Sequence, residues 1–341
     1  MQLPKEYMPK VPLTFRKDGG FRILMMSDLH HAPNTGDRTI RAMAQLIDRT
    51  GPDLVLLGGD NTTGKSTKEE FAQLLSDIAS PMEARGIPWA HVFGNHDISE
   101  GLSKEYQQTR YEQYAHCVSK AGPDGVPGVG NFFLPIVDEN GTPVFGVWGL
   151  DSQQELNTQT EPLNYPGDLY WDLLMPSRIA SYADYDFIRF EQIMWYWNTS
   201  VALEKLCGRK IPSLMAFHIP LFEFYALLKN AGRTQLRGEY NERLSISEVN
   251  SGLFAAVLQR GDVRAMFAGH DHINTFDGIY CGIRMGFDGS IGYHAYGTRD
   301  NDPASKNRDR LRGGRVFDIT RDDPWHICTD MVFVDESHGE K

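Results

Sequence analysis

Short apolar runs and amphipathic segments alternate between Phe21 and Gly94, and this alternation limits the possible folds more than any other feature of the sequence. The runs FRILMM and DLVLLGG are typical of strands buried on both faces, while DRTIRAMAQLIDRTG between them has a helical period that ends at Gly51. A second helix is predicted in TKEEFAQLLSDIASPMEARG, with Pro81 inside it, and a third strand in PWAHVFG. Strands that alternate with helices form parallel βαβ units, so we expect an α/β (α+β) fold with both sheet faces covered.

The rest of the chain continues this mixture. Strands are predicted in NFFLPI, PVFGVWGL, SLMAF and RAMFAG, and helices in YDFIRFEQIMWYWNTSVALEKLCG and EVNSGLFAAVLQRG. From IYCGIRMGF to WHICTDMVFV, apolar and polar residues alternate as in antiparallel strands, around the charged loop TRDNDPASKNRDRLRGG. An irregular insert rich in Tyr, Asn, Pro and Gly covers about residues 151–186, and a loop-rich stretch reaches Ser247. Since no linker interrupts the pattern, we predict a single domain over residues 1–341, with its core at about 21–335.

The charge balance narrows the range of partners. The 341 residues include 45 acidic and 34 basic side chains, a formal net charge of −11, which disfavours a nucleic-acid partner because the phosphate backbone is also negative. No apolar run approaches the ~18 residues that a membrane span needs, so we expect a soluble chain with no membrane partner. Its compartment stays open: cytoplasmic, or secreted after removal of a signal peptide. The oligomeric state is unknown.

The cysteines give no sign of a metal or redox motif. They lie far apart, and none belongs to a C-x-x-C pair. A chain of this length can build its own core without disulfides. We therefore expect free, mostly buried thiols at Cys117, Cys207, Cys281 and Cys328.

Side chains of one chemical kind follow five of the predicted strands. They are Asp28 and His30 in SDLHH, Asp60 in GGDN, Asn95, His96 and Asp97 in GNHD, His218 in FHIP, and His270 and His272 in GHDH. Loops at the carboxyl ends of parallel strands meet at one edge of a sheet. Carboxylates and imidazoles are ligands of divalent transition metals. Two aspartates, one asparagine and four histidines are too many for one tetrahedral site and suit two metals that share a bridge.

Each of these residues has an ordinary structural interpretation when it is taken alone. Asp28 or Asp60 could cap a following helix, since aspartate after a strand is a favoured N-cap. Asn95 after a glycine could form a turn, and His218 could be a hydrogen-bonded core histidine. Only their joint order on successive strand ends favours a metal site.

That order resembles the signature of the calcineurin-like metallophosphoesterases: D-x-H, G-D, G-N-H-D, a single histidine after a strand, then G-H-x-H. The matching blocks span Asp28 to His272, most of the chain. The stretches NSGLF, GDVRAMFAGHDHIN and GYHAYG also resemble the small purple-acid-phosphatase-related enzymes of plants and fungi. The resemblance implies a four-layer αββα sandwich of two mixed β-sheets, with two metals at the loop ends.

The resemblance also implies a role for each matching residue. The ligand sets are Asp28, His30 and His272 for the first metal and Asn95, His218 and His270 for the second. Asp60 would bridge the two metals. His96 would be the catalytic histidine, and Asp97 would orient its ring. Asn95 and His96 would also contact the substrate.

One departure from the purple acid phosphatases concerns the metals. Those enzymes have D-x-G in the first block and a tyrosine three residues after the G-D aspartate, whereas this chain has His30 and Thr63. The tyrosinate that binds ferric iron is therefore missing, and a histidine is added. The resemblance thus leaves manganese, zinc and iron open for the two metal ions.

The implied chemistry is hydrolysis of a phosphate ester. Two cations ~3.5–4 Å apart would generate a bridging hydroxide near neutral pH and neutralise the phosphoryl oxygens. His96 would give a proton to the leaving oxygen. We expect a phosphomonoesterase that acts on a small phosphorylated molecule or a phosphoprotein. The alternatives are a phosphodiesterase and a non-catalytic scaffold, and a scaffold would be expected to lack ligands.

A glycine-rich stretch near the end of the chain, GSIGYHAYGTR, offers further substrate contacts. Tyr293, His294, Tyr296 and Arg299 could each contact phosphate. The ordinary alternative is an aromatic strand and turn packed beside the site.

Overall fold

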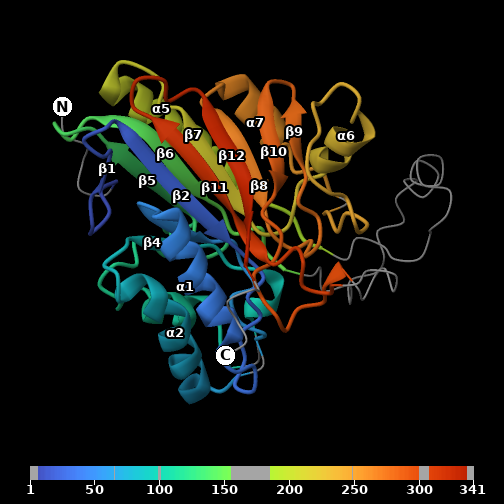
Figure 1. Ribbon diagram of the computed structural model, residues 1–341. Coiled ribbons are helices and arrows are strands. Elements are labelled where there is room, and N and C mark those ends of the chain that lie inside the picture. The colour runs from blue at the N-terminus through green and yellow to red at the C-terminus, as the bar shows by residue number, and fades with distance from the viewer. Residues whose placement is uncertain are drawn as a thin grey trace.

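The computed structural model describes most of the chain, and the described residues form a mixed α/β fold (Figure 1). They are residues 7–64, 66–98, 101–154, 185–247, 249–298 and 307–335. Most of the predicted insert, residues 155–184, lies outside this set. None of the described helices is long and apolar enough to cross a membrane.

The strands of the described residues make two mixed sheets. One has the order β1 (Leu13–Thr14), β5 (Phe132–Val137), β6 (Pro143–Gly149), β7 (Ser213–Phe217), β8 (Val263–Ala268), β10 (Ile283–Phe287), β9 (Asp277–Tyr280). The other has the order β12 (Ile327–Phe333), β11 (Gly313–Thr320), β2 (Gly20–Met26), β3 (Leu54–Leu57), β4 (Trp89–His91). In the first sheet β6, β7, β8 and β10 are parallel neighbours, and in the second β2, β3 and β4 are. The predicted βαβ units are therefore present in both sheets.

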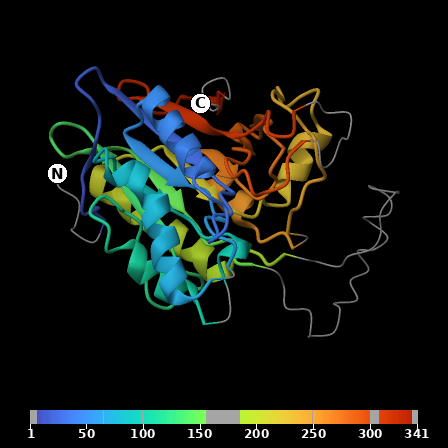
Figure 2. The same cartoon turned by 60° about the horizontal axis from the view of Figure 1, so that its bottom comes forward.

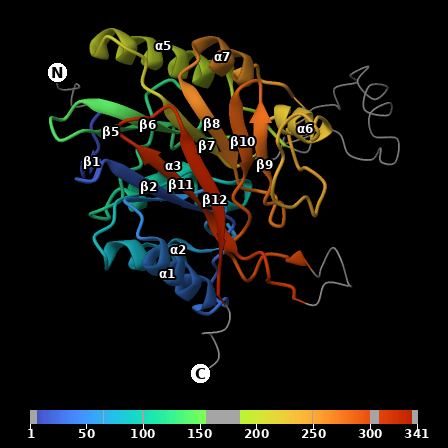
Figure 3. The same cartoon turned by 45° about the horizontal axis from the view of Figure 1, so that its top comes forward.

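Helices cover the outer face of each sheet, which makes four layers. Figure 3 shows α5 (Phe190–Cys207), α6 (Glu223–Lys229) and α7 (Leu253–Arg260) on one side of the two sheets, with α1 (Arg38–Thr50) and α2 (Lys68–Glu83) on the other. Figure 2 shows α1 and α2 side by side. This is the expected αββα sandwich.

Strand β2 shows why the layers hold together. Successive side chains of a strand point to opposite faces. Ile23 and Met25 belong to the apolar core between the two sheets, whereas Leu24 and Met26 belong to the core under α1 and α2. A third core lies between the larger sheet and α5, α6 and α7. A strand buried on both faces therefore appears in the sequence as the uninterrupted apolar run that predicted it.

Helix α2 accommodates its internal proline in its last turn. Pro81 lacks the N–H that would donate to the carbonyl of Asp77. The hydroxyl of Ser80 donates to that carbonyl instead, at 2.8 Å. The helix begins at a capping box in which Thr67 accepts from the N–H of Glu70 and the Glu70 carboxylate accepts from the N–H of Thr67.

Three helices show the main differences between the structure and the sequence prediction. Helix α3 (Lys104–Tyr111) was not predicted because its residues are largely polar and lack an apolar period, although Ser103 caps it. The loop-rich stretch before Ser247 contains α6. Helix α7 begins only at Leu253, after a left-handed Gly252, and not at the start of EVNSGLFAAVLQRG.

The cysteines are free, as expected, but the prediction that most are buried was wrong. Cys117 is buried and Cys207 is half-buried, whereas Cys281 and Cys328 are exposed. Cys281 has a positive φ of 49° and Gly282 one of 81°, and the two form the tight turn between β9 and β10. Two left-handed residues match the turn that joins antiparallel strands, and this turn projects the thiol from the sheet.

Candidate metal centre

Loops from the carboxyl ends of both sheets bring six of the predicted ligands into two groups. Asp28, His30 and His272 form the first, which we call the outer group. Asp60, His218 and His270 form the second, which we call the inner group. In each group one ligand atom per residue lies within 4.8 Å of the others. Aspartates from the smaller sheet thus meet histidines from the larger one.

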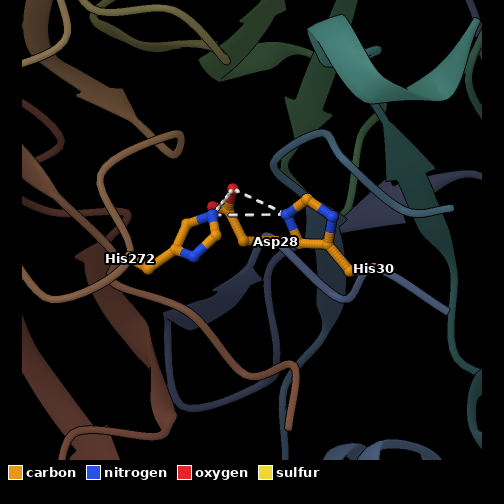
Figure 4. Close-up of side chains that lie close together, drawn as sticks. All are labelled: Asp28, His30 and His272. Atoms are coloured by element: carbon orange, nitrogen blue, oxygen red, sulfur yellow. Dashed lines mark hydrogen bonds and ion pairs between the residues drawn. The ribbon is translucent and has the colours of Figure 1, made fainter. Parts of the chain in front are cut away.

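The outer group closes around three facing atoms (Figure 4). The Oδ1 atom of Asp28 lies 3.2 Å from Nε2 of His272 and 3.9 Å from Nε2 of His30. The two imidazole nitrogens are 3.2 Å apart. Ligands on one ion with bonds of about 2.1 Å would be separated by roughly 3.0–3.4 Å, so these spacings are close to those of a coordination shell.

The inner group has the same spacing and touches the outer group through one carboxylate. Nε2 of His218 lies 3.2 Å from Oδ2 of Asp60 and 3.3 Å from Nδ1 of His270. The same Asp60 oxygen lies 3.6 Å from Nε2 of His30 in the outer group. Asp60 therefore faces both groups, as a bridging ligand must.

The chemistry of the facing atoms fits cations. In the described part of the chain, Asp28 Oδ1 and Asp60 Oδ2 are buried without a hydrogen-bond donor. An unpaired buried carboxylate oxygen is costly, and a cation would satisfy it together with the imidazole lone pairs that face it. Asn95, the remaining predicted ligand, is buried at the start of the short helix η1 (Asn95–Asp97) after β4, and its ligand role stays a prediction.

Four of these residues have a left-handed backbone. The φ angles are 53° at Asp28, 45° at His30, 50° at Asp60 and 74° at His270. Non-glycine residues rarely adopt this conformation, and it persists only where the surroundings enforce it. The loops enforce it by bonding to one another: the N–H of Asp28 donates to Gly59 O and the N–H of His30 to Asp60 O, both at 2.9 Å. The sequence carried no signal for this strain.

A main-chain contact orients His218 of the inner group. Nδ1 of His218 donates to the carbonyl of Gly58 at 2.9 Å, so that Nε2 faces Asp60. A Cβ atom at Gly59 would lie 2.5 Å from that same Nδ1, and one at Gly94 would lie 2.1 Å from Asp60 Oδ1. The glycines of the G-D and G-N blocks are therefore needed for close approach of the loops.

The second oxygen of Asp28 is held by residues that the sequence did not single out. Oδ2 accepts from the N–H of His270 at 3.0 Å and from the hydroxyl of Ser27. Asp288 is buried and lies 3.1 Å from the Ser27 hydroxyl through Oδ1. Burial and the charge of Asp28 raise the pKa of Asp288 well above its ordinary value. A sixth strand end, FDGS after β10, was the signal that could have found it.

In the metal-free chain, burial and the neighbouring charges determine which side chains of the two groups are ionised. Burial opposes ionisation of Asp28, but the imidazoles around it hold its pKa at about 2, and the pKa of Asp60 is lowered for the same reason. Burial lowers the pKa of His218 less than the two carboxylates raise it, and it reaches about 10. Burial lowers the pKa of His30 to about 4 and that of His270 to about 3. One imidazolium then lies between two carboxylates.

The predicted catalytic residues lie beside the groups in different settings. His96 is exposed, and its ring centre is 5.2 Å from that of His30. Its backbone N–H donates to Asp60 Oδ1 at 2.8 Å. Asp97 is buried, and its two oxygens accept from the N–H groups of Thr62 and Gly94 at 2.9 and 2.8 Å. The carboxylate thus fastens two loops together, in place of the expected bond to the His96 ring.

The predicted substrate contacts of the glycine-rich stretch are not equivalent. The ring of Tyr293 is buried beneath the guanidinium of Arg38, 3.7 Å away, and His294 bonds the carbonyl of Thr35, so both contact the segment around the start of α1. Tyr296 instead stacks on His272. Arg299 lies outside the described residues.

Two ligand groups in an αββα sandwich, with an exposed histidine beside them, define a metal-dependent phosphoester hydrolase. Residues 21–274 match the profile of the calcineurin-like phosphoesterases, and the chain belongs to that family. The resemblance seen in the motif blocks is thereby confirmed.

Individual proteins extend this match beyond the motifs. Probable inactive purple acid phosphatase 28 of Arabidopsis thaliana is 29% identical over 306 residues, which cover 85% of this chain and 75% of the relative. Phosphatase DCR2 of Saccharomyces cerevisiae is 27% identical over 284 residues, 76% of this chain and 45% of that protein. A crystal structure of a dimetal phosphatase from Danio rerio shares the fold at a TM-score of 0.55 and 12% identity, covering 92% of this chain and 99% of the other.

Proposed function

We propose that this chain is a phosphomonoesterase with a binuclear metal centre. The observation that carries the proposal is the position of Asp60, whose Oδ2 lies 3.2 Å from Nε2 of His218 and 3.6 Å from Nε2 of His30. One carboxylate oxygen within reach of a histidine from each group supports a pair of cations that share a ligand. Manganese, zinc and iron all suit this mixture of imidazole and carboxylate donors.

His96 and Asp97 would have separate roles in the reaction. Two cations bound there would supply charge for the phosphoryl oxygens and a nucleophilic water near neutral pH. His96, exposed beside the outer group, would donate a proton to the leaving oxygen, a step typically worth ~10²–10⁴-fold. The bond from its N–H to Asp60 Oδ1 ties the position of His96 to that of the shared ligand. Asp97 would hold the His96 and Asp60 loops in register.

The proposed substrate is a small phosphorylated molecule or a phosphoprotein. The formal charge of −11 disfavours long nucleic acids, whose cleavage would require a diesterase. DCR2 is named a phosphatase, whereas the Arabidopsis relative is named probably inactive. A non-catalytic scaffold would not require paired ligand groups, and this chain keeps both.

Parallel assays on p-nitrophenyl phosphate and bis-p-nitrophenyl phosphate test the proposal, with metal analysis of the same sample. A monoesterase hydrolyses the first faster and carries two transition-metal ions per chain. Faster hydrolysis of the diester would assign the centre to a phosphodiesterase. A chain that carries two metals and hydrolyses neither ester would be the scaffold.

A further inference from the structure

A tyrosine outside the five motif blocks covers one ligand of the outer group. The ring of Tyr296 stacks on that of His272, with ring centres 4.1 Å apart and planes 21° from parallel. Tyr296 is 36% exposed, so one part of the side chain borders solvent while its face meets the imidazole. The tyrosine comes from the GYHAYG stretch, whose role the proposed function leaves unexplained.

The hydroxyl of Tyr296 is anchored beside the same histidine. It donates to Oε2 of Glu242, and the other carboxylate oxygen, Oε1, accepts from the N–H of Ile273 at 2.7 Å. Ile273 directly follows His272 in the chain. The carboxylate therefore joins the covering ring to the backbone that carries the covered ring.

Glu242 is itself fixed to the G-H-x-H loop. The side-chain oxygen of Asn274 accepts from the N–H groups of Asn241 and Glu242 at 2.9 and 3.1 Å. The amide nitrogen of Asn274 donates to the carbonyl of Glu242 at 3.0 Å. Tyr296 is therefore connected to His272 in two ways. Its ring stacks on the imidazole, and its hydroxyl bonds Glu242, which is hydrogen-bonded to the loop that follows His272.

His272 needs this support more than His218 does. The Nδ1 atom of His218 donates to the carbonyl of Gly58, which fixes its ring plane. Nδ1 of His272 is buried with no hydrogen-bond partner in the described residues, and Nε2 faces the outer group. Metal-bound histidines are usually oriented by a bond from the second ring nitrogen. Ring stacking is what remains to orient His272.

We propose that Tyr296 and Glu242 are a positioning pair that sets the ring plane of His272 for metal binding in the outer group. The pair takes the place of the hydrogen bond that orients His218 in the inner group. The inference rests on the proposed function only in requiring a cation at each group.

Titration calorimetry of the metal-stripped full chain with Mn²⁺ tests the pair. The wild-type chain should show two binding steps. Tyr296→Leu removes the flat face and should weaken one step by about 10–100-fold, the usual loss when a partner of a metal ligand is removed, and leave the other unchanged. Tyr296→Phe keeps the face and loses only the bond to Glu242, so its loss should be smaller, roughly 3–10-fold.

Tyr240→Leu is the matched control. Tyr240 lies in the same loop as Glu242 and is 49% exposed, but its ring packs edge-on against Phe276 and not on a ligand. This variant should bind Mn²⁺ as the wild type does. The melting temperature of each metal-free variant shows whether weaker Mn²⁺ binding comes from a misoriented His272 ring or from a destabilised fold.

Two results overturn the inference. Both binding steps of Tyr296→Leu could stay at the wild-type values, or, if that variant does not fold, Tyr296→Phe could bind Mn²⁺ as tightly as the wild type. A wild-type chain that binds none of Mn²⁺, Zn²⁺ and Fe²⁺ in the same titration would overturn the proposed function and the inference together. Two wild-type steps with unchanged variants would overturn the inference alone.

Discussion

The two ligand groups have similar donors but differ in how the protein holds them. All three residues of the inner group are buried; the carbonyl of Gly58 orients His218, and the ring of Tyr185 packs edge-on against His270 with ring centres 4.5 Å apart. In the outer group, His30 is 12% exposed at its side chain, and His272 is covered by the side chain of Tyr296. All three inner-group residues are thus buried, whereas the outer group reaches solvent at His30 and has the partly exposed Tyr296 over His272.

This difference indicates that the two groups tolerate change unequally. Buried polar groups fixed by the backbone are expensive to disturb, because a lost partner leaves a charge or lone pair in the interior. Groups held by side chains near solvent can reorient and be rehydrated. We therefore expect substitutions of the fully buried Asp28, Asp60 and His218 to affect folding as well as metals, and substitution of the partly exposed His30 to affect metals more than folding.

Asp60 lies within reach of a histidine from each group, so its substitution should have the largest effect on metal binding and turnover. Asp60→Asn keeps the shape of the side chain but removes the charge that faces His30 and His218. The variant should lose both metals and at least about 10³-fold in turnover, since each cation supplies several kcal/mol of charge stabilisation. Metal analysis and a phosphatase assay check this. Two metals retained per chain would show that Asp60 is not the bridge.

His96 lies beside the outer group without belonging to it, so its loss should separate chemistry from metal binding. His96→Ala should lower turnover by about 10²–10⁴-fold through loss of the proton donor. Metal content should stay at two per chain, because His96 belongs to neither ligand group. His116→Ala, a substitution of a half-buried histidine that bonds Glu83, is the control. Full activity in His96→Ala would contradict its role.

Matched alanine substitutions compare the groups directly. His218→Ala leaves Asp60 without its buried partner and should lower the free energy of unfolding of the metal-free chain by about 3 kcal/mol. His30→Ala changes the outer-group histidine whose side chain is 12% exposed and should lower it by less, about 1 kcal/mol, while still abolishing one metal site. Urea denaturation in chelator measures both values. Equal destabilisation by the two variants would remove the distinction drawn between the groups.

The metal-free chain should also lose stability at alkaline pH through the inner group. The pKa of His218 is about 10 when folded, so its stabilising interaction is complete below its ordinary value of 6.5 and is lost as the pH rises through 10. The free energy of unfolding should fall by a few kcal/mol over that range. His218→Gln should lack this slope, and so should the metal-loaded chain. An unchanged slope in His218→Gln would assign the effect to other groups.

The sequence predicted the ligands because each block is local. A strand end followed by Asp or His can be recognised within five residues, and the parallel order of β2, β3 and β4 brings such ends together. The supporting contacts are distant: Tyr296 and Glu242 are 54 positions apart, and Ser27 and Asp288 are 261 apart. No sequence pattern within a few residues of either partner predicts these contacts.

For Asp97, the resemblance implied a contact that the structure does not show. The resemblance implied that it orients the ring of its neighbour, but its oxygens are occupied by the N–H groups of Thr62 and Gly94. Backbone donors outnumber side-chain donors in a tight loop, and the backbone geometry that brings them to Asp97 cannot be read from residue types. The left-handed conformations of Asp28, His30 and Asp60 are hidden for the same reason.

The proposed function requires that the two groups form one centre that shares Asp60. Electron paramagnetic resonance of the chain loaded with two equivalents of Mn²⁺ tests it most directly. Ions about 3.5–4 Å apart on a common carboxylate should give the spectrum of a spin-coupled pair. The six-line spectrum of isolated Mn²⁺ at both sites, or binding of a single ion per chain, would contradict the account.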